Sequence, residues 1–169
     1  MEARAKILGH PIHQMLIVFP LGLLATSFFF DIAFLLSHEN QLATVAFCMI
    51  LAGVIGRLVA TVFGLIDWLA IPAGTRAKAI GLWHGGGNVV VVVLFIASWF
   101  LRRPSPSEPA TVAIILSAIG VGIALMTGWM GGELVGRLGV GVSEGAHLDA
   151  PSSLSGRPAT DNEGKVKGR

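Results

Sequence analysis

The sequence predicts an all-α integral membrane protein: a bundle of four antiparallel transmembrane helices with a disordered C-terminal tail. Three observations predict this fold class. First, the 169-residue chain is 13% charged with a mean hydropathy of +0.74, whereas a soluble domain carries about 25% charged residues. Second, four apolar segments are each long enough to cross a hydrocarbon core about 30 Å thick. Third, the connections between them are short and polar or rich in proline and glycine, which suits antiparallel neighbours.

The four spans are expected at residues 11–36, 42–68, 79–101 and 110–134, within a transmembrane domain of residues 1–142. The first apolar run exceeds the roughly 7–15 residues of a secretory signal and lacks its small-residue cleavage site, so we expect a retained anchor. A polar segment, 37–41, separates it from the second span. Proline and glycine in 71–78 precede the third span, and three prolines in 102–109 precede the fourth.

The remaining 27 residues, 143–169, contain serine, glycine, proline and mixed charge with almost no large apolar side chains. Such a segment buries too little surface to offset its ordering entropy, so we expect a disordered tail. An even number of spans places both termini on one side of the membrane. Basic residues near the span ends favour a bacterial inner membrane with cytoplasmic termini: five on the terminal side (Arg4, Lys6, Arg76, Lys78 and Arg137) against two opposite (Arg102 and Arg103).

Several function classes are disfavoured. The net charge is +2 and the basic residues form no run, so nucleic-acid binding is not expected. Cys48 is the single cysteine, which excludes an intrachain disulfide. The sequence contains no G-x-S-x-G or Walker motif, and an enzyme is therefore less expected than a non-enzyme. No internal repeat is evident, which weighs against a small transporter.

Polar residues gather towards the terminal end of all four spans. They are His10 and His13 on the first span, Arg57 and Asp67 on the second, Trp83, His84 and Asn88 on the third, and Trp129, Glu133 and Arg137 on the fourth. Ionisable residues in a span cost about 2.5–3.5 kcal/mol each and usually face a partner or cavity. The pattern therefore predicts an inward polar seam near the cytoplasmic face. Asp31 and Pro20 lie on the same face of the first helix as His13, and Pro20 could kink that helix.

At these residues the chain resembles a family of bacterial predicted membrane proteins, catalogued as domain of unknown function twenty-two thirty-one. The matching motifs are His10-Pro11-Ile12-His13 with Phe19-Pro20, Gly64-Leu65-Ile66-Asp67-Trp68, Trp83-His84 with Asn88, and Gly128-Trp129-Met130-Gly131-Gly132-Glu133-Leu134-Val135 followed by Arg137 and Gly139-Val140-Gly141-Val142. The likeness covers roughly residues 8–142. It implies a four-helix membrane domain, in some relatives joined to redox modules such as Rieske-type iron–sulfur domains, and hence a possible redox partner protein.

Two ligand-binding hypotheses arise from this cluster. Haem b could be ligated by His13 and His84, with His10 as a substitute, for electron transfer. Arg57, Arg76 or Lys78 would then neutralise the propionates, Trp83 and Trp129 would pack on the ring, and Asn88 shares a face with His84. Alternatively, a divalent metal could be held by His13, His84, Asp67 and Glu133, with His10 as a further donor.

The third hypothesis is a non-catalytic structural or assembly subunit of a membrane complex, whose polar cluster is an internal staple. On this interpretation His10-Pro11 starts a helix and the tryptophans form an interfacial belt. Glu133 would pair with Arg137, and Asp67 with Arg57 or Arg76. The lipid bilayer is the expected surrounding, and a homo-oligomer is compatible with all three hypotheses.

Overall fold

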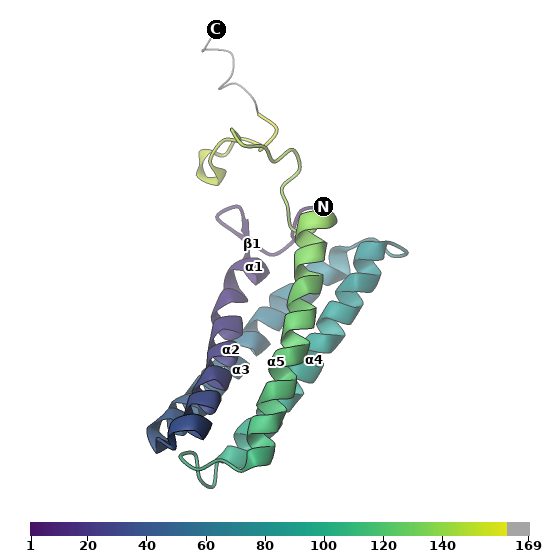
Figure 1. Ribbon diagram of the computed structural model, residues 1–169. Coiled ribbons are helices and arrows are strands. Elements are labelled where there is room, and N and C mark those ends of the chain that lie inside the picture. Colours follow the sequence, from purple (N-terminus) through teal and green to yellow (C-terminus); the bar gives the residue numbers. More distant parts are fainter. Residues whose placement is uncertain (162–169) are drawn as a thin grey trace.

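The computed structural model describes residues 1–161 and contains four long helical spans that run up and down side by side (Figure 1). The first span is formed by α1 (Ile12–Leu16) and α2 (Val18–Ser37), the second by α3 (Asn40–Ala70), the third by α4 (Arg76–Arg102), and the fourth by α5 (Thr111–Gly132) with its π-helical extension η1 (Glu133–Arg137). All four are long and apolar enough to cross a membrane. The predicted all-α membrane bundle is confirmed.

Local chemistry extends the spans by a few residues beyond their predicted bounds. The third span begins at Arg76 because Thr75 caps it: the Thr75 hydroxyl accepts a hydrogen bond from the Lys78 backbone N–H at 3.1 Å. The same span continues through Arg102, which sequence analysis placed in the following loop. Arg102 is therefore the last residue of the helix and not part of the loop.

The first span is interrupted at Ile17, between α1 and α2. Pro20 follows three residues later, and its ring crowds the preceding helical turn while supplying no N–H. The break at Ile17 therefore lies within one turn of Pro20, the residue predicted to kink this helix. Pro20 itself is buried and faces the bundle interior.

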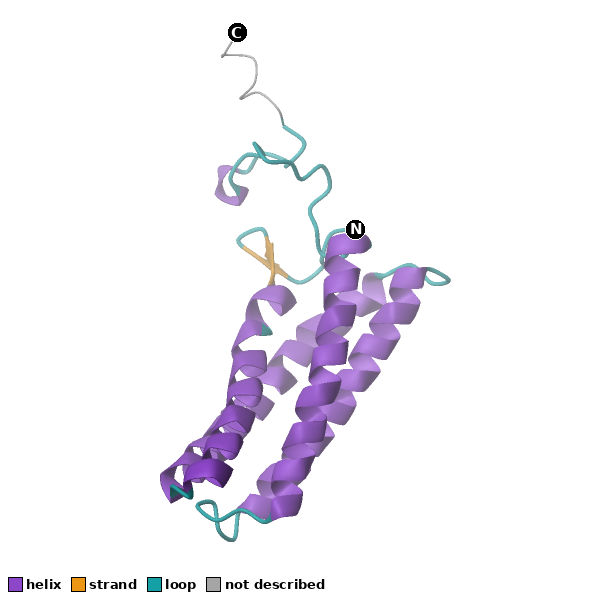
Figure 2. Cartoon of the chain, in the orientation of Figure 1, coloured by secondary structure: helices purple, strands orange, loops and turns teal. Residues whose placement is uncertain are grey.

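A short N-terminal hairpin precedes the first span, with β1 (Lys6–Ile7) paired antiparallel to β2 (His10–Pro11), drawn in orange in Figure 2. The predicted tail leaves the bundle at the same end as the N-terminus (Figure 1). Residues 143–161 form loops and turns, with one 3-10 turn, η2 (Ser153–Ser155). Residues 162–169, also part of the predicted tail, lie outside the described residues.

The bundle consists of two helical hairpins. The first span packs on α3, and α4 packs on α5, more extensively than the hairpins pack on each other. Each hairpin closes over a glycine: Leu24 of α2 lies against Gly53 of α3, and Phe95 of α4 lies against Gly120 of α5. These large side chains join one apolar core, formed by Leu24, Ile50, Val54, Val91, Phe95 and Ala124.

Candidate functional site

In each hairpin one histidine fastens the two helices to each other, and the contact is the same in both. The Nδ1 atom of His13, on α1, lies 2.8 Å from the backbone oxygen of Ala60 on α3. The Nδ1 atom of His84, on α4, lies 2.8 Å from the backbone oxygen of Thr127 on α5. A carbonyl oxygen only accepts hydrogen bonds, so each Nδ1 carries the proton.

A glycine four residues along the partner helix makes room for each ring. A Cβ atom at Gly64 would lie 2.8 Å from the ring of His13, and one at Gly131 would lie 3.2 Å from the ring of His84. The first distance is too short for any real Cβ contact and the second is unusually tight. Gly64 and Gly131 therefore each leave the space that a histidine ring of the neighbouring helix occupies.

Asn88 connects the two hairpins. Its side-chain oxygen accepts hydrogen bonds from Arg57 of α3 and from the Thr127 hydroxyl of α5, the latter at 3.1 Å. Its side-chain nitrogen donates to Nε2 of His84 at 3.1 Å, so His84 is in the neutral form. Arg57, His84 and Asn88 thus lie together, and each contacts a neighbouring helix.

The two histidines line one cavity of about 80 Å³, partly open at its side. Its other polar residues are Arg57, Thr61, Asn88 and Thr127. About 10–15 Å³ of such space holds one water, so the cavity has room for a few water molecules. Pockets for organic ligands measure about 300–1,000 Å³. A macrocycle would therefore require the helices to separate.

Asp67 and Glu133 lie away from this cavity. The Asp67 carboxylate accepts hydrogen bonds from the backbone N–H groups of Arg4 at 2.7 Å and Ala5 at 3.1 Å, which fastens the N-terminal segment to α3. Glu133 forms an ion pair with Arg76 at 2.7 Å. The expected pairs Asp67 with Arg57 or Arg76, and Glu133 with Arg137, are wrong: Asp67 binds the N-terminal backbone, and Glu133 binds Arg76.

The other predicted ligand-site residues also lie outside the cavity. His10 is exposed on β2, with Nε2 3.3 Å from the Ser153 hydroxyl. Trp83 and Trp129 are 71% and 70% exposed and so face outwards, not towards the cavity. Lys78 donates to the backbone oxygen of Trp68 at 2.7 Å. Within residues 1–161, no cluster of three or more His, Cys, Asp or Glu side chains could hold a metal ion. The predicted four-residue metal set is therefore not assembled.

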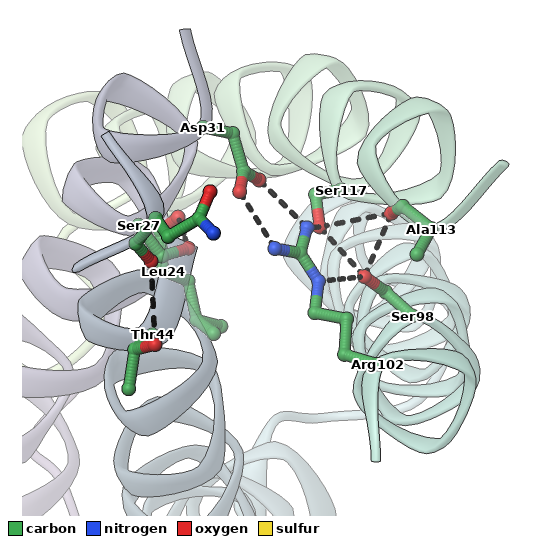
Figure 3. A network of polar contacts seen from close by, with 9 residues as sticks. Leu24, Ser27, Asp31, Thr44, Ser98, Arg102, Ala113 and Ser117 are labelled. Atoms are coloured by element: carbon green, nitrogen blue, oxygen red, sulfur yellow. Dashed lines mark hydrogen bonds and ion pairs between the residues drawn. The ribbon is translucent and has the colours of Figure 1, made fainter. Parts of the chain in front are cut away.

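The most buried polar group is one that sequence reasoning missed. Asp31 of α2 and Arg102 of α4 form a two-pronged ion pair, with N–O distances of 2.6 and 2.7 Å, and both side chains are 0% exposed (Figure 3). Arg102 also donates to the Ser98 hydroxyl at 3.1 Å and the Ser117 hydroxyl at 3.2 Å. Asp31 therefore contacts Arg102, although the sequence places it on the same helix face as His13.

The two hairpins repeat this design position by position. The buried residues Pro20, Leu24, Ser27 and Asp31 of α2 correspond, 71 positions later, to Val91, Phe95, Ser98 and Arg102 of α4, which are also buried. His13 corresponds to His84 at the same interval. On the returning helices Gly53, Ala60 and Gly64 correspond, 67 positions later, to Gly120, Thr127 and Gly131. The bundle is an internal repeat, and the Asp31–Arg102 pair joins equivalent positions of its halves.

The family comparison agrees with this architecture. Residues 9–144 match the family model described as predicted membrane protein (DUF2231). No curated protein and no solved structure matches the chain. Because the match spans the four helices and both histidine contacts, the chain belongs to this DUF2231 family of predicted membrane proteins.

Proposed function

We propose that the protein is a non-catalytic structural or assembly subunit of a membrane complex, whose polar residues fasten its four helices into one unit. The observation that carries this proposal is that the polar contacts cross between helices. His13 joins α1 to α3, His84 and Thr127 join α4 to α5, and Arg57 joins α3 to Asn88 of α4. At the other end of the bundle, Asp31 and Arg102 join α2 to α4.

A second candidate is the binding of haem b or a divalent metal for electron transfer. One observation favours it: both histidines line the same cavity, and each donates through Nδ1, which leaves its Nε2 lone pair as the ligating atom. Against it, Nε2 of His84 already accepts from Asn88, and the cavity is small for a macrocycle. We therefore rank this candidate second.

A visible spectrum of the protein purified in detergent, oxidised and then reduced with dithionite, separates the two candidates. The staple proposal predicts no Soret band and no stoichiometric metal by elemental analysis, together with reduced unfolding stability in His13→Ala and His84→Ala. A Soret band that is lost in both variants would overturn it in favour of haem. Stoichiometric metal lost in the same variants would favour the metal site.

We also propose a bacterial inner-membrane location with cytoplasmic termini. The N-terminus and the segment 143–161 lie at the same end of the bundle (Figure 1). Arg102 is fully buried and paired, so Arg103 is the basic residue left at the opposite end. The excess of basic residues at the terminal end is therefore larger than the sequence count indicated.

A further inference from the structure

The bundle contains two arginines between its helices, and their surroundings differ sharply. Arg102 has a complete set of partners: both carboxylate oxygens of Asp31 and the hydroxyls of Ser98 and Ser117. Arg57 lies near the middle of α3 and is partly buried. Among the described residues its side chain makes one hydrogen bond, to the neutral amide oxygen of Asn88.

No carboxylate compensates the charge of Arg57 within residues 1–161. The ion pairs described for the chain join other residues, and no Asp or Glu lines the cavity. A charged side chain at the centre of a span costs about 2.5–3.5 kcal/mol even on insertion scales, so such residues usually face a partner or a water-filled cavity. Arg57 faces the cavity that it shares with His13 and His84.

Comparison of the two hairpins shows that this positive charge is present in only one of them. The position equivalent to Arg57 in the second hairpin is Ala124, which also lines the cavity. The histidine contacts are present in both hairpins, so helix fastening of that kind does not require the guanidinium. The arginine adds one positive charge to a cavity that no Asp or Glu lines.

We propose that this cavity binds one small monovalent anion, which serves as the counterion of Arg57. A volume of about 80 Å³ accommodates an ion of chloride, nitrate or bicarbonate size. The guanidinium has N–H groups left beyond its bond to Asn88. The Asn88 side-chain amide donates one of its two hydrogens to His84 and has the other left. The same negative charge could be supplied by a lipid headgroup entering through the open side, and the experiment distinguishes these sources.

The test uses the full chain in phosphatidylcholine nanodiscs, with thermal unfolding followed by tryptophan fluorescence. Sodium chloride, nitrate or bicarbonate is titrated against sodium gluconate at constant ionic strength, because gluconate is too large for the cavity. The proposal predicts a saturable rise in Tm with each small anion. Arg57→Met weakens the apparent affinity by about tenfold or more, as expected for a lost charge-assisted hydrogen bond. The matched control, Arg103→Met, alters an exposed arginine at the opposite end and retains the response.

A second measurement does not depend on the stability of any variant. Chloride-35 NMR of the unaltered protein detects bound chloride by line broadening, which excess nitrate reverses and gluconate does not. If stabilisation instead appears on replacing phosphatidylcholine with phosphatidylglycerol and is lost in Arg57→Met, the anion is a lipid headgroup. Absence of both salt and lipid responses in the unaltered protein, or responses unchanged in Arg57→Met, would overturn the proposal.

Discussion

Replacing Arg102 with methionine tests the buried ion pair most severely. The change removes both hydrogen bonds to Asp31 and leaves that carboxylate 0% exposed with no cation beside it. Loss of one partner from a buried pair costs about 3–5 kcal/mol, because the remaining charge is uncompensated. We therefore expect Arg102→Met to lower the free energy of unfolding by about that amount. Equilibrium unfolding by SDS in mixed micelles, followed by tryptophan fluorescence, measures it.

The double variant Asp31→Leu/Arg102→Met provides the matched comparison. It removes both charges, while Ser98 and Ser117 still contact each other at 2.9 Å and Ser98 donates to the Ala113 carbonyl at 2.7 Å. Well-packed apolar replacements of buried pairs are often neutral or stabilising. We expect the double variant to recover most of the stability lost in the single variant. Equal losses in the single and double variants would refute the reasoning.

Four further changes test the helix packing and the anchoring of the N-terminal segment. Gly64→Ala should destabilise the bundle by about 1–3 kcal/mol in the same unfolding assay, because its Cβ would overlap the His13 ring. Gly131→Ala should cost less, since its Cβ would sit 3.2 Å from His84 and not 2.8 Å; the opposite order would count against the described ring positions. Gly122→Ala, with no atom within 4 Å, should raise stability by up to about 1 kcal/mol through helix propensity alone. Asp67→Ala should release the N-terminal segment and speed tryptic cleavage after Lys6, whereas an unchanged cleavage rate would contradict that anchoring role.

The sequence predicted the spans well because hydropathy and length together decide whether a segment crosses a membrane. The sequence also predicted that His13, His84, Arg57 and Asn88 lie at the same depth in the membrane. The order and direction of antiparallel helices determine the depth of each residue. Depth alone, however, does not give the rotation of each helix about its axis. Asp67 was therefore placed in the site although it contacts the N-terminal backbone.

The Asp31–Arg102 pair was missed for a related reason. Arg102 follows an apolar run and precedes Arg103 and Pro104, a pattern that is typical of a residue at the membrane surface. The contact crosses from the first hairpin to the second, and no spacing within one helix predicts it. A buried Ser98 one turn before Arg102 was a faint signal, because a serine on the inner face of a span needs a polar partner.

The internal repeat was also not evident from the sequence. Its two halves share few identical residues, among them the histidines and the glycines beside them, and the interval changes from 71 on the first helix to 67 on the second. An ungapped self-comparison therefore loses the match after one helix. The correspondence became visible through shared contacts: His13 with Ala60 and Gly64, and His84 with its own partners on α5.

Nitrogen-15 NMR of the histidine side chains in the membrane-embedded protein shows whether His13 and His84 fasten equivalent helix pairs. We expect both rings to carry a proton on Nδ1, this proton to be protected from exchange, and magnetisation to transfer to the carbonyls of Ala60 and Thr127. Rings protonated on Nε2, with contacts to lipid in place of those carbonyls, would contradict it.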